Sequence, residues 1–594
     1  MDSQVAAASR YVFAVRLVLG LAQGLVLYLL YSAFDQKAWP ATEPQLFAPL
    51  SVLALFIPPL LSQALGNVRL TTLAIWAAVA TAAVAGLVWY DQWHAWPADR
   101  LPQILPSPRI VFASAVFLFV AHALISCGDA DRRIVARYPT LFDLAWKLGV
   151  QAAIAVAFVA VFWIMLWLGV ALFDMIRLAG FHRFVQHSWF AIPATALAAA
   201  AAIHLTDTRA GMVRDVRTLA LTLLSWLLPV IALIALAFLV SLAVTGLAPL
   251  WQTGYATALL LISAAVLVIH INAAYQDGDP ERRPPHILRV AGTLAAVLLI
   301  FFVWIAAYAL WLRVDQYGWS VERIYSAACV LVSAVFAVGY LVAALLPGLW
   351  LKLIERWNVY ATFVFLAVLF ALSTPIADPM RIAVASQVAR LNSGAVKPAE
   401  FDFDYLRYFG GRFGRDALAA LTASPDQATR EGAAAALANQ QRRFVRRVAK
   451  VSAEALAKAI TAYPAGKPLP ASFLRQDWRL ASRPLNIESC VAKTATKERC
   501  KAVLADLDGD GKDEIIVIHP FATAEEFWLA DVFRWNGASW NGVGALNAPH
   551  CRGDLKALLD GRFKAVPHQP PLADLEIDGR RVDVATYSRP VSCR

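Results

Sequence analysis

The sequence predicts a mainly α fold: a polytopic transmembrane helical bundle of about eleven spans, an extracytoplasmic helical segment and a small β-rich domain. The first observation is composition, because 59% of the 594 residues are hydrophobic and only 16% are charged. That is too little charge for a soluble enzyme of this length, and the mean hydropathy of +0.56 agrees. The second observation is a succession of long apolar runs, and the third is a change to short, β-like runs near the C-terminal end.

The long apolar runs identify the spans. Crossing about 30 Å of hydrocarbon takes roughly 20 apolar residues in a helix, because a helix satisfies its own backbone polar groups. We expect spans at 10–33, 45–65, 69–91, 109–127, 141–175, 188–206, 216–245, 252–275, 287–313, 321–346 and 357–376. The fifth, seventh and ninth runs exceed one bilayer thickness and are expected to tilt or to project beyond it.

The distribution of Lys and Arg in the loops predicts the orientation, since positive charge is retained on the cytoplasmic side. With the N-terminus inside, the cytoplasmic segments contain fourteen Lys and Arg residues and the opposite loops contain seven. An odd number of spans then places everything after residue 376 outside the cytoplasm. The formal net charge of +11 follows mostly from this bias and a basic C-terminal region, so it requires no nucleic-acid partner.

Four of the six cysteines lie in the soluble tail and favour an oxidising compartment. They are Cys490, Cys500, Cys551 and Cys593. Of the three possible pairings we favour Cys490–Cys500 with Cys551–Cys593, because the first closes a short local loop. Spacing alone does not settle the pairing, and four free buried thiols are the alternative.

Composition divides the chain into four parts. Residues 1–376 form the transmembrane helical domain, and 377–465 are rich in Ala, Arg and Glu with helical spacing, which predicts two or three amphipathic helices. A Pro- and Gly-bearing stretch introduces a linker at 466–484. Residues 485–594 contain the runs CKAVLADL, EIIVIHP, WLADVFRW and RRVDVATYS, separated by turn signals such as WNGASWNG, and predict a disulfide-stapled β-rich domain.

The stretch DLDGDGKDE in this last domain has the pattern of a calcium loop. Carboxylates stand at positions 1, 3 and 5, a glycine permits the sharp turn at position 6, a lysine can offer its carbonyl at position 7, and a glutamate follows at position 9. The predicted ligands are Asp506, Asp508, Asp510, Lys512 and Glu514. Alternate oxygen ligands on a flexible loop suit Ca²⁺, and we expect a structural ion. The alternative is a solvated acidic turn without metal.

Position 12 of this loop is Val517 rather than the bidentate Glu of an EF-hand. The loop instead resembles the calcium loops of FG-GAP and related β-repeat proteins, in which an acidic loop leads into a strand. One repeat cannot close a propeller, so only the loop is implied by this resemblance.

Most of residues 10–420 resemble one bacterial membrane family. The motifs that carry the resemblance are RLVLGLAQGLVLYLLY, LFAPL, WYDQW, LFDMI, RVDQYGWSVER, RIAVASQVARLNSG and FDFDYLRYFGGRFGRDAL. They are similar to the family called domain of unknown function 4153. The resemblance implies a multi-pass protein of the bacterial inner membrane. The loop charges predict a cytoplasmic N-terminus and a periplasmic C-terminal domain. The resemblance brings no reaction, substrate or catalytic residue.

Two clusters at the ends of spans are possible binding sites. The predicted outer face carries mixed charge that could grip a phosphate or carboxylate, because Arg binds oxyanions in bidentate fashion. These substrate-binding candidates are Asp174, Arg177, Arg313, Asp315, Glu322 and Arg323. The alternative is helix-end charges that fix depth in the membrane. On the inner face, His122, His204 and His270 stand at equal depth; independent interfacial residues are the favoured interpretation and a metal site is the alternative.

Three functions remain open, and the sequence leaves undecided whether the protein is an enzyme. Transport or translocation of an envelope solute or amphiphile is favoured by the kinked spans and the cationic rim. A membrane transferase acting on a lipid-linked donor is the second hypothesis, because C-type glycosyltransferases are similar in gross layout; Asp35 and Glu43 in the first outer loop would be its candidate bases. A scaffold or sensor that binds an envelope partner is the third. The lipid bilayer is the one certain partner.

Overall fold

Eleven helices of the described chain are long and apolar enough to cross a membrane, as the sequence predicts. The computed structural model describes residues 2–95, 105–176, 178–252, 255–279, 281, 284–438, 452–464, 467–476, 478, 490, 500–518, 530–546, 551, 553–564, 575–577 and 580–582. The chain divides into two units, residues 1–440 and 441–594. All the candidate spans belong to the first unit.

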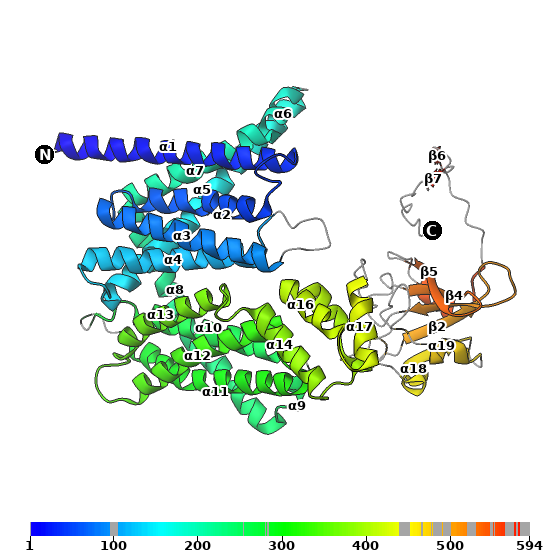
Figure 1. Cartoon of the computed structure of the whole chain (residues 1–594). Coiled ribbons are helices and arrows are strands. Elements are labelled where there is room, and N and C mark those ends of the chain that lie inside the picture. Colours follow the sequence, from blue (N-terminus) through cyan, green and yellow to red (C-terminus); the bar gives the residue numbers. More distant parts are fainter. Residues whose placement is uncertain are drawn as a thin grey trace. The chain divides into compact units, whose positions relative to one another are not determined.

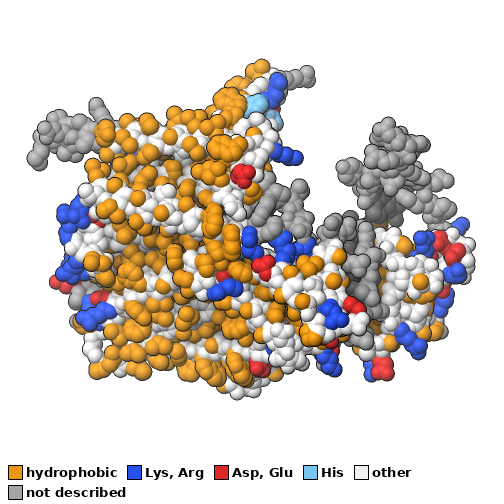
Figure 2. Space-filling model, viewed as in Figure 1, with side chains coloured by type: hydrophobic (Ala, Val, Ile, Leu, Met, Phe, Trp, Pro, Cys, Tyr) orange, Lys and Arg blue, Asp and Glu red, His pale blue; other side chains and the backbone are white. Residues whose placement is uncertain are grey.

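The spanning helices lie side by side in the first unit (Figure 1). They are α1 (Asp2–Asp35), α2 (Pro44–Ala64), α3 (Leu70–Ala95), α4 (Pro108–Asp131), α5 (Tyr138–Met175), α7 (Ser188–Thr208), α8 (Ala210–Thr245), α10 (Ala256–Tyr275), α11 (His286–Tyr317), α12 (Val321–Leu345) and α13 (Ile354–Leu372). Two short helices, α6 (Ala179–Gln186) and α9 (Ala248–Gln252), lie between spans. Hydrophobic side chains cover the broad face of this unit, and Lys and Arg gather at its edges (Figure 2).

The spans form two groups with separate cores. Helices α1 to α4 and α7 pack with one another, whereas α8 and α10 to α13 surround a second core. Helix α5 lies between the groups: Tyr138 and Phe142 belong to the second core, whereas the helix also packs along α7 and α4 of the first group. We call the boundary where α4 and α5 meet α8 and α13 the seam.

Small residues allow the closest helix contact of the first group, between α1 and α7. A Cβ atom built on Gly24 would lie 2.4 Å from the Cα of Pro193, and one on Gly20 would lie 2.5 Å from the Cβ of Ala200. Without a hydrophobic driving force in lipid, such close approach supplies much of the van der Waals attraction between spans.

Beyond the last span, a group of short helices packs on the end of the bundle. They are α14 (Pro379–Asn392), the 3₁₀ turn η1 (Pro398–Glu400), α15 (Phe403–Phe409), α16 (Gly411–Leu421) and α17 (Gln427–Ala438), around a core that includes Leu406 and Leu418. The sequence predicts two or three helices over 377–465, whereas the described residues up to 438 form four α-helices and a 3₁₀ turn, with α15 and α16 separated at Gly410. Gln387 of α14 fixes the group to the α11–α12 loop by donating to the carbonyls of Tyr317 and Trp319.

The second unit contains a five-stranded mixed sheet with the order β1-β2-β3-β4-β5. Its strands are β1 (Ile460–Tyr463), β2 (Cys500–Ala505), β3 (Glu514–Ile518), β4 (Ala530–Trp535) and β5 (Trp540–Leu546). β1 runs parallel to β2, and the other neighbours are antiparallel. Helices α18 (Ala453–Ala459), α19 (Ala471–Arg475) and α21 (Asp554–Leu559) accompany this sheet, and a hairpin of β6 (Leu575–Ile577) and β7 (Arg580–Val582) stands apart from it in the chain.

The predicted bond between Cys490 and Cys500 is present, with a Cα–Cα distance of 5.3 Å. Cys551 is also disulfide-bonded, and Cys593, its predicted partner, lies outside the described residues. The first bond closes a loop of ten residues beside the buried start of β2.

Candidate functional site

A buried polar cluster lies where the end of α3 meets α14. One oxygen of Asp378 accepts hydrogen bonds from the hydroxyl of Tyr90 (2.6 Å) and from Nδ1 of His94 (3.0 Å). Its other oxygen caps α14 by accepting from the backbone N–H groups of Met380 and Arg381. The exposed fraction of Asp378 is 0%, so its hydrogen bonds are all made inside the protein.

The imidazole in this cluster lies between two carboxylates. Nε2 of His94 is 3.9 Å from Oδ1 of Asp91, and both side chains are largely buried. Asp91 in turn accepts from the hydroxyl and the backbone N–H of Ser107, at the start of α4. We call Tyr90, Asp91, His94, Ser107 and Asp378 the His94 cluster. A histidine placed in this way can hold a proton or pass it between the two carboxylates.

Hydrogen bonding decides the charge of Asp378. Burial by itself raises the pKa of this carboxyl group, but the hydrogen bonds from His94 and Tyr90 outweigh burial, and its pKa lies below the usual value. The ionised carboxylate only accepts, so Nδ1 of His94 carries the proton in their hydrogen bond. The cluster therefore links α3 to α14 through a buried negative charge.

A second cluster of charges lies at the opposite end of the first helix group. Arg16 of α1 is 1% exposed and forms an ion pair of 2.7 Å with Asp207 of α7. The same nitrogen of Arg16, Nη2, also donates to the carbonyl of Leu65 at the end of α2 (2.7 Å). Lys147 of α5 lies 3.5 Å from the other oxygen of Asp207, and Asn67 donates to the same carboxylate. One carboxylate thus joins α1, α5, α7 and the α2–α3 loop.

An uncharged polar ring lies inside the second helix group. Asn272 donates to the hydroxyl of Tyr340 (2.6 Å), which donates to Asn358 (2.7 Å), and Asn358 donates back to Asn272 (2.6 Å). Each member comes from a different span. Because every bond in the ring is matched, its evident role is to fix α10, α12 and α13 against one another.

An open apolar cavity of about 350 Å³ lies along α5. Its lining is Ala145, Trp146, Gly149, Val150 and Ala153. A Cβ atom built on Gly149 would meet no heavy atom within 4 Å, so the glycine leaves room that a larger residue would fill. Trp146 packs on the second core, whereas its neighbour Lys147 contacts α7.

The structure separates the two halves of the predicted outer rim. Asp174, at the end of α5, contacts His182 of α6 (3.2 Å), and Arg177 lies outside the described residues. The other four residues lie at the α11–α12 junction, on the far side of the unit from α6 (Figure 1). Arg323 there donates to the carbonyl of Gly318 (2.7 Å) and lies over the ring of Tyr317.

The remaining three rim residues surround this junction without a common centre. The carbonyl of Asp315 accepts from Arg390 of α14 (3.3 Å), Arg313 faces the like charge of Arg323, and Glu322 lies in the first turn of α12. These contacts stabilise the attachment of α14 to the bundle. Binding of a substrate by the rim stays a prediction.

Asp35 and Glu43 lie at the two ends of the short turn between α1 and α2. Both side chains are exposed, and Glu43 precedes α2 without capping it through its side chain. The structure places no buried base or oriented partner beside either of them among the described residues. Their role in a transferase stays a prediction.

The three histidines at the predicted inner ends of spans have separate surroundings. His122 accepts from Trp76 (3.2 Å) and contacts Gln63, His204 lies 3.4 Å from Arg16, and His270 contacts the carbonyl of Val266. Within the described residues they form no group that could bind one metal ion.

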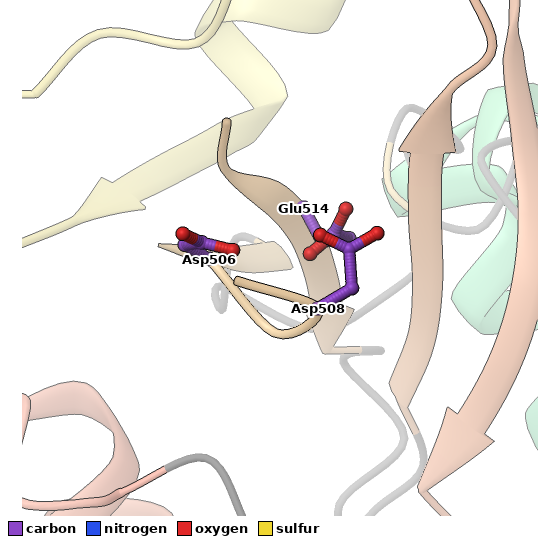
Figure 3. Close-up of side chains that lie close together, drawn as sticks. All are labelled: Asp506, Asp508 and Glu514. Carbon is purple, nitrogen blue, oxygen red and sulfur yellow. The ribbon is translucent and has the colours of Figure 1, made fainter. Parts of the chain in front are cut away.

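The acidic loop of the second unit brings three of its predicted ligands together. Asp506, Asp508 and Glu514 offer oxygen atoms that all lie within 4.8 Å of one another. The two aspartates come from the β2–β3 turn and Glu514 begins β3 (Figure 3). Among the described residues this is the one group of at least three His, Cys, Asp or Glu side chains with that geometry.

Several carboxylate oxygens of this turn already accept hydrogen bonds or contact an arginine. Asp506 accepts from the backbone N–H groups of Gly509 and Gly511, and Arg534 approaches Asp508 to 3.3 Å. Asp510 lies outside the triad and accepts from the backbone N–H of Lys512 (2.8 Å). Three hard oxygen donors on a turn fit Ca²⁺, provided that Arg534 gives way.

Sequence reasoning missed the His94 cluster and the pair of Arg16 with Asp207. A signal existed for each in part: a charge inside the first apolar run, and an Asp before Pro379 that has the form of a helix cap. Nothing in one sequence pairs His94 with a residue 284 positions later.

Comparison with known proteins gives one match. No curated protein and no solved structure matches the chain. The profile of one family, described as Domain of unknown function (DUF4153), matches residues 21–423, which include all but the first part of the membrane bundle and the helices to α16. Because this match covers more than half of the chain and agrees with the motifs in the sequence, the protein belongs to the DUF4153 family.

Proposed function

We propose that this protein translocates an amphiphile, a molecule with an apolar chain and a polar head, along the seam between its two helix groups. The cavity on α5 is the observation that carries the proposal. Its lining is mostly apolar, it lies within a span, and its residue Trp146 packs on the core of the second helix group. The indole N–H of Trp146 is the one side-chain hydrogen-bond donor among these lining residues, so an apolar chain suits the cavity better than a polar solute.

The arrangement of the helices supports movement along this line. Each helix group has its own core, so a shift of one group against the other would break the contacts along the seam and the link from α3 to α14 through Asp378. Transporters commonly rock one bundle against another around a site between them. The Arg16–Asp207 pair ties α1 to α7 within the first group and would keep that group rigid during such a shift.

We further propose that the N-terminus is cytoplasmic and that the second unit is periplasmic. Eleven candidate spans among the described residues and the excess of Lys and Arg in alternate loops support this orientation. The Cys490–Cys500 bond supports an oxidising compartment for the tail. A calcium ion on Asp506, Asp508 and Glu514 would then stabilise the tail in a compartment where millimolar affinity suffices.

Movement of lipid is the test of the translocation proposal. Purified protein is reconstituted in vesicles containing a trace of phospholipid with a fluorescent headgroup, and chemical quenching of the outer leaflet reports exchange between leaflets. We expect the wild type to accelerate exchange and Gly149→Leu to reduce that acceleration at least fivefold, because leucine fills the cavity.

Gly86→Leu is the matched control. Gly86 also lies within a span, and a Cβ there would meet nothing within 4 Å, but it is remote from the α5 cavity. It should leave exchange unchanged. Absence of exchange in the wild type, or equal loss in the two variants, would overturn the proposal.

A further inference from the structure

We propose that the cation-rich end of the α5 cavity binds the anionic headgroup of a phospholipid, with one acyl chain of that lipid in the cavity. The headgroup would lie against Lys147 and Arg217. This inference rests on the proposed function in treating the cavity as a lipid site, and it adds the class of lipid and the residues that select it.

Charge is the first observation. Arg217 of α8 binds Asp143 of α5 at 2.8 Å, one helical turn from Lys147, which shares Asp207 with Arg16. Three cations therefore pair with two carboxylates along this part of α5: Arg217 with Asp143 on the side of α8, and Arg16 and Lys147 with Asp207 on the side of α7. An excess of positive charge next to an apolar cavity is stabilised by a bound anion, and basic pockets between spans commonly hold anionic lipid headgroups.

Unused hydrogen-bond donors are the second observation. The Nε atoms of Arg16 and Arg217 are buried and have no hydrogen-bond partner among the described residues. Arg16 is 1% exposed, so it contributes charge rather than contact. The side chains of Lys147 (29%) and Arg217 (22%) are partly exposed, and a phosphate oxygen can reach them.

The spacing along α5 fits a lipid. Residues 143 and 147 share a face of the helix, and Val150, one turn on, belongs to the cavity lining. From Ala145 to Ala153 the lining extends about 12 Å along the axis at 1.5 Å per residue, close to half of a hydrocarbon core of about 30 Å. One chain can thus extend from the charges toward the middle of the bilayer.

This inference is tested by comparing the binding of two lipids that differ only in their headgroup. The full-length protein in detergent is titrated with phosphatidylglycerol or with phosphatidylcholine carrying the same chains, and native mass spectrometry counts the bound lipid. We expect the wild type to prefer phosphatidylglycerol at least tenfold, which is about 1.4 kcal/mol. The double variant Lys147→Gln, Arg217→Gln should reduce the preference to less than threefold.

Control variants distinguish a loss of headgroup preference from a general loss of folded protein. Arg69→Gln removes another inner-end ion pair, with Asp129 (2.6 Å), away from the cavity, and should keep the preference. Lys147→Arg with Arg217→Lys keeps both charges and should restore it. Gly149→Leu should weaken binding of both lipids equally, because it blocks the chain.

The outcomes are distinct from those of the exchange assay. If the double variant keeps the tenfold preference, or if Arg69→Gln loses it equally, this inference is wrong, even where the wild type still exchanges lipid. A last measurement adds inorganic phosphate to protein with bound phosphatidylglycerol. If phosphate displaces the lipid at a concentration as low as that of the lipid itself, the site binds the free anion, and the lipid assignment is wrong.

Discussion

Asp378 shows how one residue holds two segments together far apart in the chain. Its carboxylate serves α14 as a cap and binds Tyr90 and His94 of α3 at the same time. An Asp directly before a proline is a recognisable helix cap, but its partners in α3 lie nearly 300 positions earlier. Local chemistry of a residue is thus predictable, whereas its long-range partners depend on packing that one sequence does not state.

We expect Asp378→Asn to lower stability by about 3 kcal/mol, because a buried charge that accepts four hydrogen bonds is lost. The folded pKa of Asp378 is lowered, so its contribution is complete above the unfolded value of about 3.9 and is lost as the pH falls through the folded pKa. Thermal unfolding of the two proteins should therefore differ at pH 7 and begin to converge only below a pH of about 4, as the pH falls toward the lowered folded pKa of Asp378.

Asp426→Asn is the matched control for this measurement. Asp426 also accepts from a backbone N–H at a helix start, that of Thr429 (2.7 Å), and hydrogen bonding lowers its pKa, but it is exposed. Its loss should change the melting temperature far less. A constant difference between wild type and Asp378→Asn across the acid range would contradict the linkage argument.

At the scale of elements, the sequence pattern predicted whether a segment is a helix or a strand better than it predicted where each element begins and ends. The eleven apolar runs became eleven helices because hydropathy and length alone decide that a helix spans. In the tail, ITAY lies in a segment with helical composition, yet it forms β1 because Ile460 pairs in parallel with Cys500. WNGASWNG was read as a turn, whereas its second half begins β5 after a tight turn held by Asn536.

The β2–β3 turn is the element on which the calcium proposal depends. We expect Ca²⁺ at ten times its dissociation constant to stabilise the second unit by about 1.4 kcal/mol, seen as slower proteolysis of the tail in the full-length protein. Asp506→Asn should abolish the effect. Asp560→Asn, which breaks an exposed pair with Arg562, should retain it, and Asp510→Asn reports whether a ligand outside the triad takes part.

Protection by Ca²⁺ that survives in Asp506→Asn would exclude this turn as the site. Equal protection by Mg²⁺ would point to general screening of the acidic turn, since Mg²⁺ demands a tighter octahedron than three carboxylates on a flexible loop supply.

At the scale of the molecule, the number of spans followed from the sequence but their grouping did not. Every span is apolar on most faces, so periodicity does not say which neighbour each face meets. Small residues gave a partial signal, since Gly20 and Gly24 mark the face of α1 that packs on α7. The seam and its cavity appear only when all the helices are placed.

Orientation is the molecular property on which most of the proposals depend. An odd number of crossings that begins in the cytoplasm puts the tail in the periplasm. We therefore expect alkaline phosphatase fused after Ala438 to be active and a fluorescent protein at the same site to be dark, because the enzyme needs disulfides and the fluorophore forms inside the cell. A fusion after Arg209, between α7 and α8, is the internal control and should give the reverse pattern.

If both sites report the cytoplasm, the odd number of spans is wrong, and so is the compartment proposed for the Cys490–Cys500 bond. If both patterns are inverted together, the eleven spans stand and the Lys and Arg bias has been misread.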